Sequence, residues 1–195
     1  MGKEVKLASV HQLEEELSRV KRRAQRRRSL WSLIGTVLTA AAAAVLISTF
    51  WAPMIRIYGS SMSPALEEGD IVLSLKTASL ERGDLVAFYC GRKVLVKRVI
   101  ACPGELVELD REGNVYINGS LLDEPYVKEK AYGDVSVVFP CQVPEGKYFV
   151  MGDHRAVSAD SRSVEIGCVA EELIAGKIVL RVWPLPLFWN SCQVF

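Results

Sequence analysis

The sequence offers two adjacent serines, one lysine and one histidine as candidates for nucleophilic chemistry. Ser60 and Ser61 lie in "GSSMSP", which is also ordinary turn chemistry. Lys97 lies within "KVLVKRVIA", where the alternation of a strand could equally turn it to solvent. A serine is activated by a neighbouring base, and a lysine serves as that base once burial makes it neutral. The residue types alone therefore permit a serine–lysine dyad or His154 as the base, beside the simpler interpretation of turn serines and a solvent-facing lysine.

Other catalytic chemistries find little support in the sequence. It has no glycine-rich phosphate-binding loop and no His/Cys cluster with metal-ligand spacing, so we predict neither a metal nor a cofactor. The chain has five cysteines, an odd number, so they cannot all pair with one another. Their disulfide pairing stays open, and we expect buried free thiols by default. The cysteines are Cys90, Cys102, Cys141, Cys168 and Cys192.

A long uncharged segment precedes these candidates. From Ser29 to Ile55 the chain carries no charged residue over 27 positions, and about 20 apolar residues suffice to cross a bilayer. Trp31 and Trp51 lie near its ends, where interfacial aromatics are typical. The segment is longer than the core of a cleaved secretory signal, so we predict an uncleaved anchor at residues 29–55.

The charges flanking this segment predict its orientation. Residues 1–28 hold nine Lys/Arg and four Glu, a net charge of +5, and "RVKRRAQRRR" carries seven of the basic residues. Basic flanks stay in the cytoplasm. We expect a single-pass protein with residues 1–28 inside and residues 56–195 outside. His11 would then lie on the inner side, out of reach of an outward site. Because topology accounts for the basic residues, no nucleic-acid partner is predicted.

The outward part has the pattern of a mainly β domain. Short apolar runs such as "DIVLSL", "DLVAFYC", "KVLVKRVIA", "VSVVF" and "KYFVMGD" are separated by Gly and Pro. "LVELD" and "VYING" flank "REGN", which predicts a hairpin. Only "AEELIAG" has a helical pattern. We expect an antiparallel, barrel-like domain behind one N-terminal transmembrane helix, with residues 120–140 forming a long connection.

Four segments occur in an order that resembles a known family. "GSSMSPAL", "RGDLVAF", "VKRVIACPGE" and "GDHRAVSADSR" are similar to the motifs of bacterial type I signal peptidases and span the outward domain from Gly59 to about Pro184. The resemblance implies Ser61 as nucleophile, with its backbone N–H as oxyanion donor, and Lys97 as general base. It implies that Ser158 hydrogen-bonds Lys97. Other supporting residues would be Asp153, Arg155, Asp160 and Arg162.

The resemblance also has departures. Ala65 stands where the family usually has Thr, His154 where it usually has Asn, and Ala156 where a polar residue is usual. None of them replaces the implied nucleophile or base. The role of His154 stays open.

The function implied by the resemblance is removal of N-terminal signal peptides from exported preproteins at the bacterial cytoplasmic membrane. Substrates would carry small residues at positions −1 and −3. Two alternatives remain: a specialised peptidase for one or few precursors, and an inactive membrane-tethered binding domain of the same fold. The sequence reveals neither the organism, the substrate range nor the oligomeric state.

Overall fold

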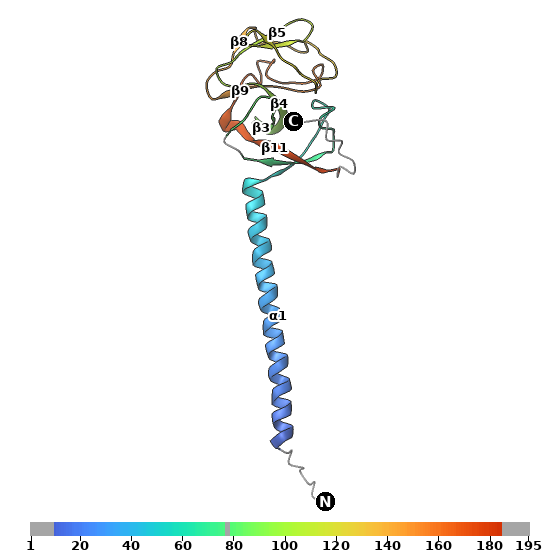
Figure 1. The fold of residues 1–195 in the computed structure, drawn as a ribbon, viewed down its shortest axis with the longest axis vertical. Coiled ribbons are helices and arrows are strands. Elements are labelled where there is room, and N and C mark those ends of the chain that lie inside the picture. Colours follow the sequence, from blue (N-terminus) through green and yellow to red (C-terminus); the bar gives the residue numbers. More distant parts are fainter. Residues whose placement is uncertain (1–9, 77–78, 185–195) are drawn as a thin grey trace, which may run out of the picture. The chain divides into compact units, whose positions relative to one another are not determined.

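The computed structural model describes residues 10–76 and 79–184 of the chain. Among these residues the only α-helix, α1, runs from Val10 to Trp51 (Figure 1). It is continuous through residues 28 and 29, so the basic segment and the uncharged segment share one helix. By contacts between residues, the chain divides into two compact units, Met1–Thr49 and Phe50–Phe195.

Within α1, the stretch Gln25–Leu46 is long and apolar enough to cross a membrane. Leu33, Val37 and Leu38 are 61%, 68% and 70% exposed. A helix that is apolar around its circumference needs a nonpolar environment, because water solvates such a surface poorly. This stretch therefore suits a membrane anchor.

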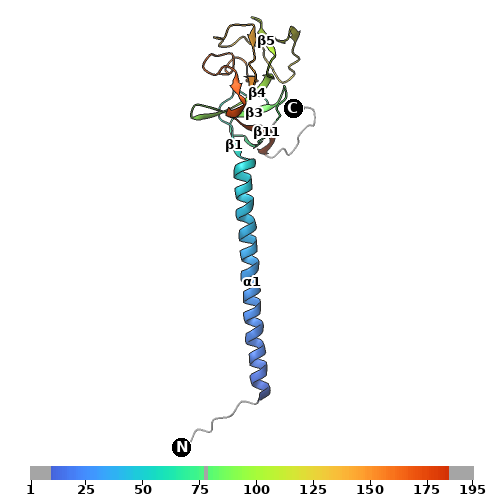
Figure 2. The same ribbon diagram turned by 90° about the vertical axis from the view of Figure 1, so that its left-hand side faces the viewer.

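The second unit contains a seven-stranded antiparallel sheet with the order β1-β2-β11-β3-β4-β9-β10 (Figure 2). The last strand of the described residues, β11, inserts between β2 and β3. The edge strands β1 and β10 are not paired with each other in the described part of the chain, so pairing does not close the sheet into a barrel there. The predicted mainly β, antiparallel architecture is confirmed. The strands are β1 Met54–Arg56, β2 Ile71–Leu75, β3 Leu85–Cys90, β4 Lys93–Ala101, β9 Lys147–Met151, β10 Val169–Ala170 and β11 Ile174–Trp183.

A smaller four-stranded sheet has the order β7-β6-β5-β8. The predicted hairpin is confirmed, because β5 pairs with β6 and aligns Leu109 with Val115. Gly113 in its turn has φ +85°, and a Cβ there would lie 2.6 Å from the backbone nitrogen of Ala131. Glycine is therefore required at this turn. The strands are β5 Leu106–Leu109, β6 Val115–Ile117, β7 Ser120–Leu121 and β8 Cys141–Gln142.

Two local expectations differ from the structure. Residues 135–139, "VSVVF", were expected to form a strand and do not. The N–H groups of Ser136 and Val137 both donate to the carbonyl of Arg162, so they are not free for a strand ladder. The helical pattern "AEELIAG" gives only the single turn η1, Glu171–Leu173, before Ile174 begins β11.

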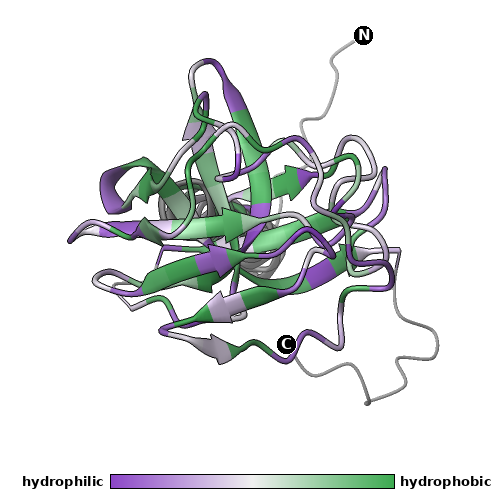
Figure 3. Cartoon of the chain, turned by 90° about the horizontal axis from the view of Figure 1, so that it is seen from above, coloured by the Kyte–Doolittle hydropathy of each residue, from purple (hydrophilic) through white to green (hydrophobic). Residues whose placement is uncertain are grey.

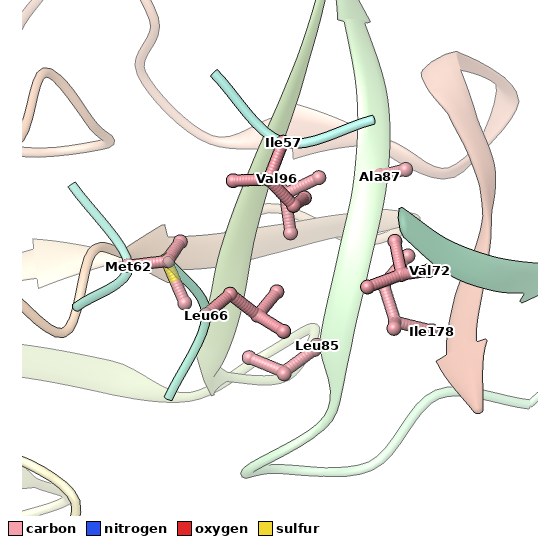
Figure 4. Close-up of a cluster of buried hydrophobic side chains, with 8 residues drawn as sticks. All are labelled: Ile57, Met62, Leu66, Val72, Leu85, Ala87, Val96 and Ile178. Carbon is pink, nitrogen blue, oxygen red and sulfur yellow. The ribbon is translucent and has the colours of Figure 1, made fainter. Parts of the chain in front are cut away.

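Apolar residues concentrate along the strands (Figure 3). One buried cluster packs on β2, β11, β3 and β4, four neighbouring strands of the seven-stranded sheet (Figure 4). It consists of Ile57, Met62, Leu66, Val72, Leu85, Ala87, Val96 and Ile178. A second cluster joins the two sheets through residues of β4, β5, β6 and β9. These clusters fix the strands against one another, because each fully buried aliphatic side chain contributes roughly 1.5–3 kcal/mol.

The four described cysteines, Cys90, Cys102, Cys141 and Cys168, are free thiols and half-buried. Burial raises the pKa of Cys168 to about 11, and the adjacent Cys141 thiol adds to the effect. Cys192 lies outside the described residues.

Candidate active site

The two serines lie in the loop between β1 and β2. Met62 is 2% exposed and Leu66 4% exposed, so both side chains anchor this loop in the core (Figure 4). The loop is closed locally by the N–H of Ser63 donating to the carbonyl of Ser60 at 3.1 Å. Because the side chain of the next residue, Met62, is buried in this cluster, Ser61 lies beside the cluster and is half-exposed.

The central contact of the site joins Ser61 to Lys97. Lys97 lies on β4 opposite Val86 of β3, and its neighbour Val96 packs in the same cluster as Met62. The side-chain nitrogen of Lys97, Nζ, lies 2.6 Å from Ser61 Oγ. The register of β4 and the anchoring of the serine loop therefore bring together two side chains that lie 36 positions apart in the sequence.

The surroundings of Lys97 favour its neutral form. The residue is only 3% exposed, and this burial lowers its pKa from the ordinary 10.5. The carboxylates of Asp160 and Asp153 act in the opposite direction, while the guanidinium of Arg162 adds to the lowering. Burial has the largest effect because a charged ammonium loses its hydration in the interior. A neutral amine at hydrogen-bond distance from a hydroxyl can accept its proton.

Arg98, the next residue on β4, makes a buried ion pair with Asp153. Its Nε and Nη2 donate to the two carboxylate oxygens at 2.9 and 2.7 Å. A third donor, Nη1, bonds the carbonyl of Gly83 at 2.8 Å, and the guanidinium carbon lies 4.0 Å from the ring centroid of Tyr126. This two-point pairing ties the loop after β9 to the strand that carries Lys97.

Asp160 and Arg162 form a second buried pair, with Arg162 Nε 2.8 Å from Asp160 Oδ1. The other carboxylate oxygen of Asp160 accepts the N–H of Gly152 at 3.0 Å. Arg162 also donates to the carbonyls of Tyr132 and Arg155, at 2.8 Å each. The pair thus fixes the backbone at Gly152 and Arg155, in the loop after β9, and at Tyr132.

Arg155 is fully buried and donates through both terminal nitrogens to Glu124. Glu124 and Tyr126 belong to this network but are not among the site residues predicted from the motifs. A buried guanidinium requires a carboxylate partner. That rule indicates that Arg155 has a partner, but it does not say which of the 23 acidic residues it is.

Ser158 differs from expectation. Its hydroxyl is buried and has no hydrogen-bond partner among the described residues, so the implied bond to Lys97 is not formed. The hydroxyl lies against Gly152, where a Cβ would lie 2.2 Å from Ser158 Oγ and 2.5 Å from the carbonyl oxygen of Ser61. Glycine at this position lets Ser158 and the serine loop approach the same backbone atom.

His154 contacts the serine loop twice. Its backbone N–H donates to the carbonyl of Ser61 at 3.1 Å, and its ring Nδ1 lies 3.3 Å from the carbonyl oxygen of Ser60. The ring therefore faces a backbone oxygen, whereas the hydroxyl of Ser61 faces Lys97. Sequence reasoning had left the role of this histidine open.

Comparison with known proteins identifies the family of this chain. The model of the family "Signal peptidase, peptidase S26" matches residues 30–183. Signal peptidase IB of Staphylococcus aureus (strain Mu50) is 34% identical over 166 residues, which cover 75% of this chain and 85% of that protein. Signal peptidase I of Bacillus licheniformis is 35% identical over 167 residues, covering 77% and 87%.

Among solved structures, a signal peptidase I from Enterococcus faecalis V583 is similar, with 33% sequence identity and a TM-score of 0.45. The match covers 53% of this chain and 100% of that one. The family match includes the serine loop, β4 with Lys97, and the loop after β9, which are the three segments that form the site. On this basis the chain belongs to the signal peptidase family, peptidase S26.

Proposed function

We propose that this protein is a membrane-bound serine endopeptidase that removes N-terminal signal peptides from exported preproteins. The observation that carries the proposal is the 2.6 Å contact between Ser61 Oγ and Lys97 Nζ, with Lys97 only 3% exposed and its pKa lowered by burial. Membership of the signal peptidase family supports preproteins as the substrates. Ser61 is the nucleophile and Lys97 the general base.

Acylation begins when Ser61 Oγ attacks the scissile carbonyl carbon while neutral Lys97 accepts the hydroxyl proton. The carbonyl oxygen becomes an oxyanion, and the backbone N–H of Ser61 donates to it. The C–N bond then breaks, and Lys97 returns the proton to the leaving amine. In deacylation Lys97 takes a proton from water, whose oxygen attacks the ester. Ser61 regains its proton, and the signal peptide leaves with a free carboxyl group.

The supporting residues act by holding the backbone and the electrostatics of the dyad. Asp153 pairs with Arg98 beside Lys97, and Asp160 pairs with Arg162. Arg155, paired with Glu124, donates through Nε to the carbonyl of Gly152. These contacts fix the loop that presents Ser158 and His154 to the serine loop. No cofactor takes part in the proposed steps.

Cleavage of a preprotein tests the proposal. The purified full-length chain in detergent should cut a preprotein with Ala-x-Ala before the mature sequence, leaving one new N-terminus directly after the second alanine. The matched control preprotein carries Trp at −1 and should be cut at least about tenfold more slowly, because a cavity that fits a methyl group excludes an indole. Mass spectrometry of the products identifies the cut. Absence of cleavage, or equal cleavage of both preproteins, would contradict the proposal.

We further propose that α1 anchors the protein in the cytoplasmic membrane by a single pass, with residues 1–28 inside and residues 56–195 outside. The proposal rests on the net charge of +5 in residues 1–28, which directly precede the uncharged segment 29–55 of the chain. A reporter that is active only outside the cytoplasm, fused after Phe195, should be active. The same reporter fused before Met1 should be inactive. Inversion of both results would place Ser61 where no exported precursor meets it.

A further inference from the structure

The loop after β9 is fitted closely to the backbone of the two serines. A Cβ at Gly152 would come within 2.5 Å of the carbonyl oxygen of Ser61, and that oxygen accepts the N–H of His154 at 3.1 Å. The His154 ring then reaches the preceding carbonyl, that of Ser60, through Nδ1 at 3.3 Å. A carbonyl oxygen only accepts hydrogen bonds, so Nδ1 carries the proton in this contact. One residue thus holds two consecutive carbonyls of the serine loop.

The carbonyl of Ser60 and the N–H of Ser61 belong to the same peptide group. A trans peptide group is planar, and its C=O and N–H point in opposite directions. Fixing the Ser60 oxygen therefore fixes the direction of the Ser61 N–H, which is the oxyanion donor of the proposed reaction. Misdirection of such a donor weakens it in the transition state, since oxyanion stabilisation depends on donors aimed in advance.

We propose that His154 is a positioning residue that orients the oxyanion-binding peptide group between Ser60 and Ser61. The inference rests on the proposed serine peptidase function. Gly59, two residues before the nucleophile, has no side chain with which to add a second donor from that position. Without a side-chain donor from that position, the direction of the Ser61 N–H matters more for oxyanion stabilisation. The Ser60 carbonyl also accepts the N–H of Ser63 at 3.1 Å, so His154 and Ser63 together fix the direction of this carbonyl.

The same geometry separates this role from general base catalysis. The Ser61 hydroxyl is bonded to Lys97 at 2.6 Å, whereas the His154 nitrogen that faces the loop points its proton at a backbone carbonyl. In a neutral ring with its proton on Nδ1 the lone pair is on Nε2, and the described hydrogen bond of the Ser61 hydroxyl is the one with Lys97, not one with that nitrogen. His154 acts through the peptide group and not on the reacting hydroxyl.

Substitutions at His154 test the inference in the full-length chain in detergent, with an Ala-x-Ala preprotein. His154→Ala should lower kcat about two- to tenfold, the range of one net hydrogen bond, and leave KM within about twofold. His154→Asn should restore kcat, because the amide nitrogen of Asn can occupy the place of Nδ1. His154→Gln should not, because its amide lies one carbon further out. His11→Ala is the matched control and should leave both constants unchanged.

The outcomes separate the inference from the proposed function. Unchanged kcat in His154→Ala, a loss confined to KM, or equal rescue by Gln and Asn would overturn the positioning role. A wild-type protein without cleavage, or a Ser61→Ala variant as active as the wild type, would overturn the function instead. Thermal unfolding of each variant controls for folding. If His154→Ala is destabilised, kcat of His154→Asn is compared with kcat of His154→Gln at equal Tm of the two variants. This comparison still tests the inference, because a packing role predicts no difference in kcat between the two amides.

Discussion

Lys97→Arg should be nearly as inactive as Lys97→Ala, with kcat/KM reduced at least about 10³-fold in both. Arginine keeps the positive charge and the length of the side chain. Its guanidinium stays protonated in proteins, so it cannot give up a proton to become a base. Cleavage of an Ala-x-Ala preprotein by the full-length variants measures the effect. Substantial activity in the arginine variant would mean that residue 97 supplies only a positive charge.

Lys177 provides the matched control for this experiment. It lies on β11, is one-third exposed, and forms an ion pair with Asp84 at 2.7 Å, whereas the described hydrogen bond of Ser61 Oγ is with Lys97. Lys177→Ala should leave kcat/KM within about twofold, because partly exposed ion pairs contribute little. Thermal unfolding of the Lys97 variants shows whether the larger guanidinium disturbs the buried position. Lys97→Met, neutral and of similar length, should also be inactive and should fold.

The lowered pKa of Lys97 also predicts the pH dependence of the same reaction. Only the neutral amine accepts the proton of Ser61, so kcat/KM should fall as the pH drops through the pKa of Lys97 in the free enzyme. Burial places that midpoint below the ordinary 10.5. A profile with no acid limb, or one that persists unchanged in an active Lys97→Arg variant, would assign the titration to another group.

Ser61→Ala should abolish cleavage, reducing kcat by about 10⁴-fold or more to the background rate. Ser60→Ala should stay within about twofold of the wild type, because the described contacts of Ser60 are made by its backbone carbonyl, which the substitution keeps. The two variants differ by the position of a single missing oxygen, so each controls for the other. A loss confined to Ser60→Ala would show that Ser60 is the nucleophile, and equal losses from both would show that the loop tolerates neither change.

Much of the architecture follows from local properties of the chain. The uncharged segment predicted a long apolar helix, and α1 contains one. Alternating apolar runs bounded by Gly and Pro predicted most longer strands, since these patterns depend on neighbours in the sequence. The hairpin of β5 and β6 was predictable because Gly113 permits its turn. Local pattern failed at residues 135–139, where a distant carbonyl, that of Arg162, takes the N–H groups that a strand would use.

The candidate site, like the fold, was predictable from the sequence only in part. The motifs indicated Ser61 and Lys97 by resemblance, but their contact depends on the anchoring of Met62 and on the register of β4 against β3. The partner of Arg155, the unpaired hydroxyl of Ser158 and the two contacts of His154 became visible only in three dimensions. Each depends on loops brought together by packing across long sequence separations. Residue types specify which groups can donate, accept or ionise, whereas packing decides which of them meet and which lose their water.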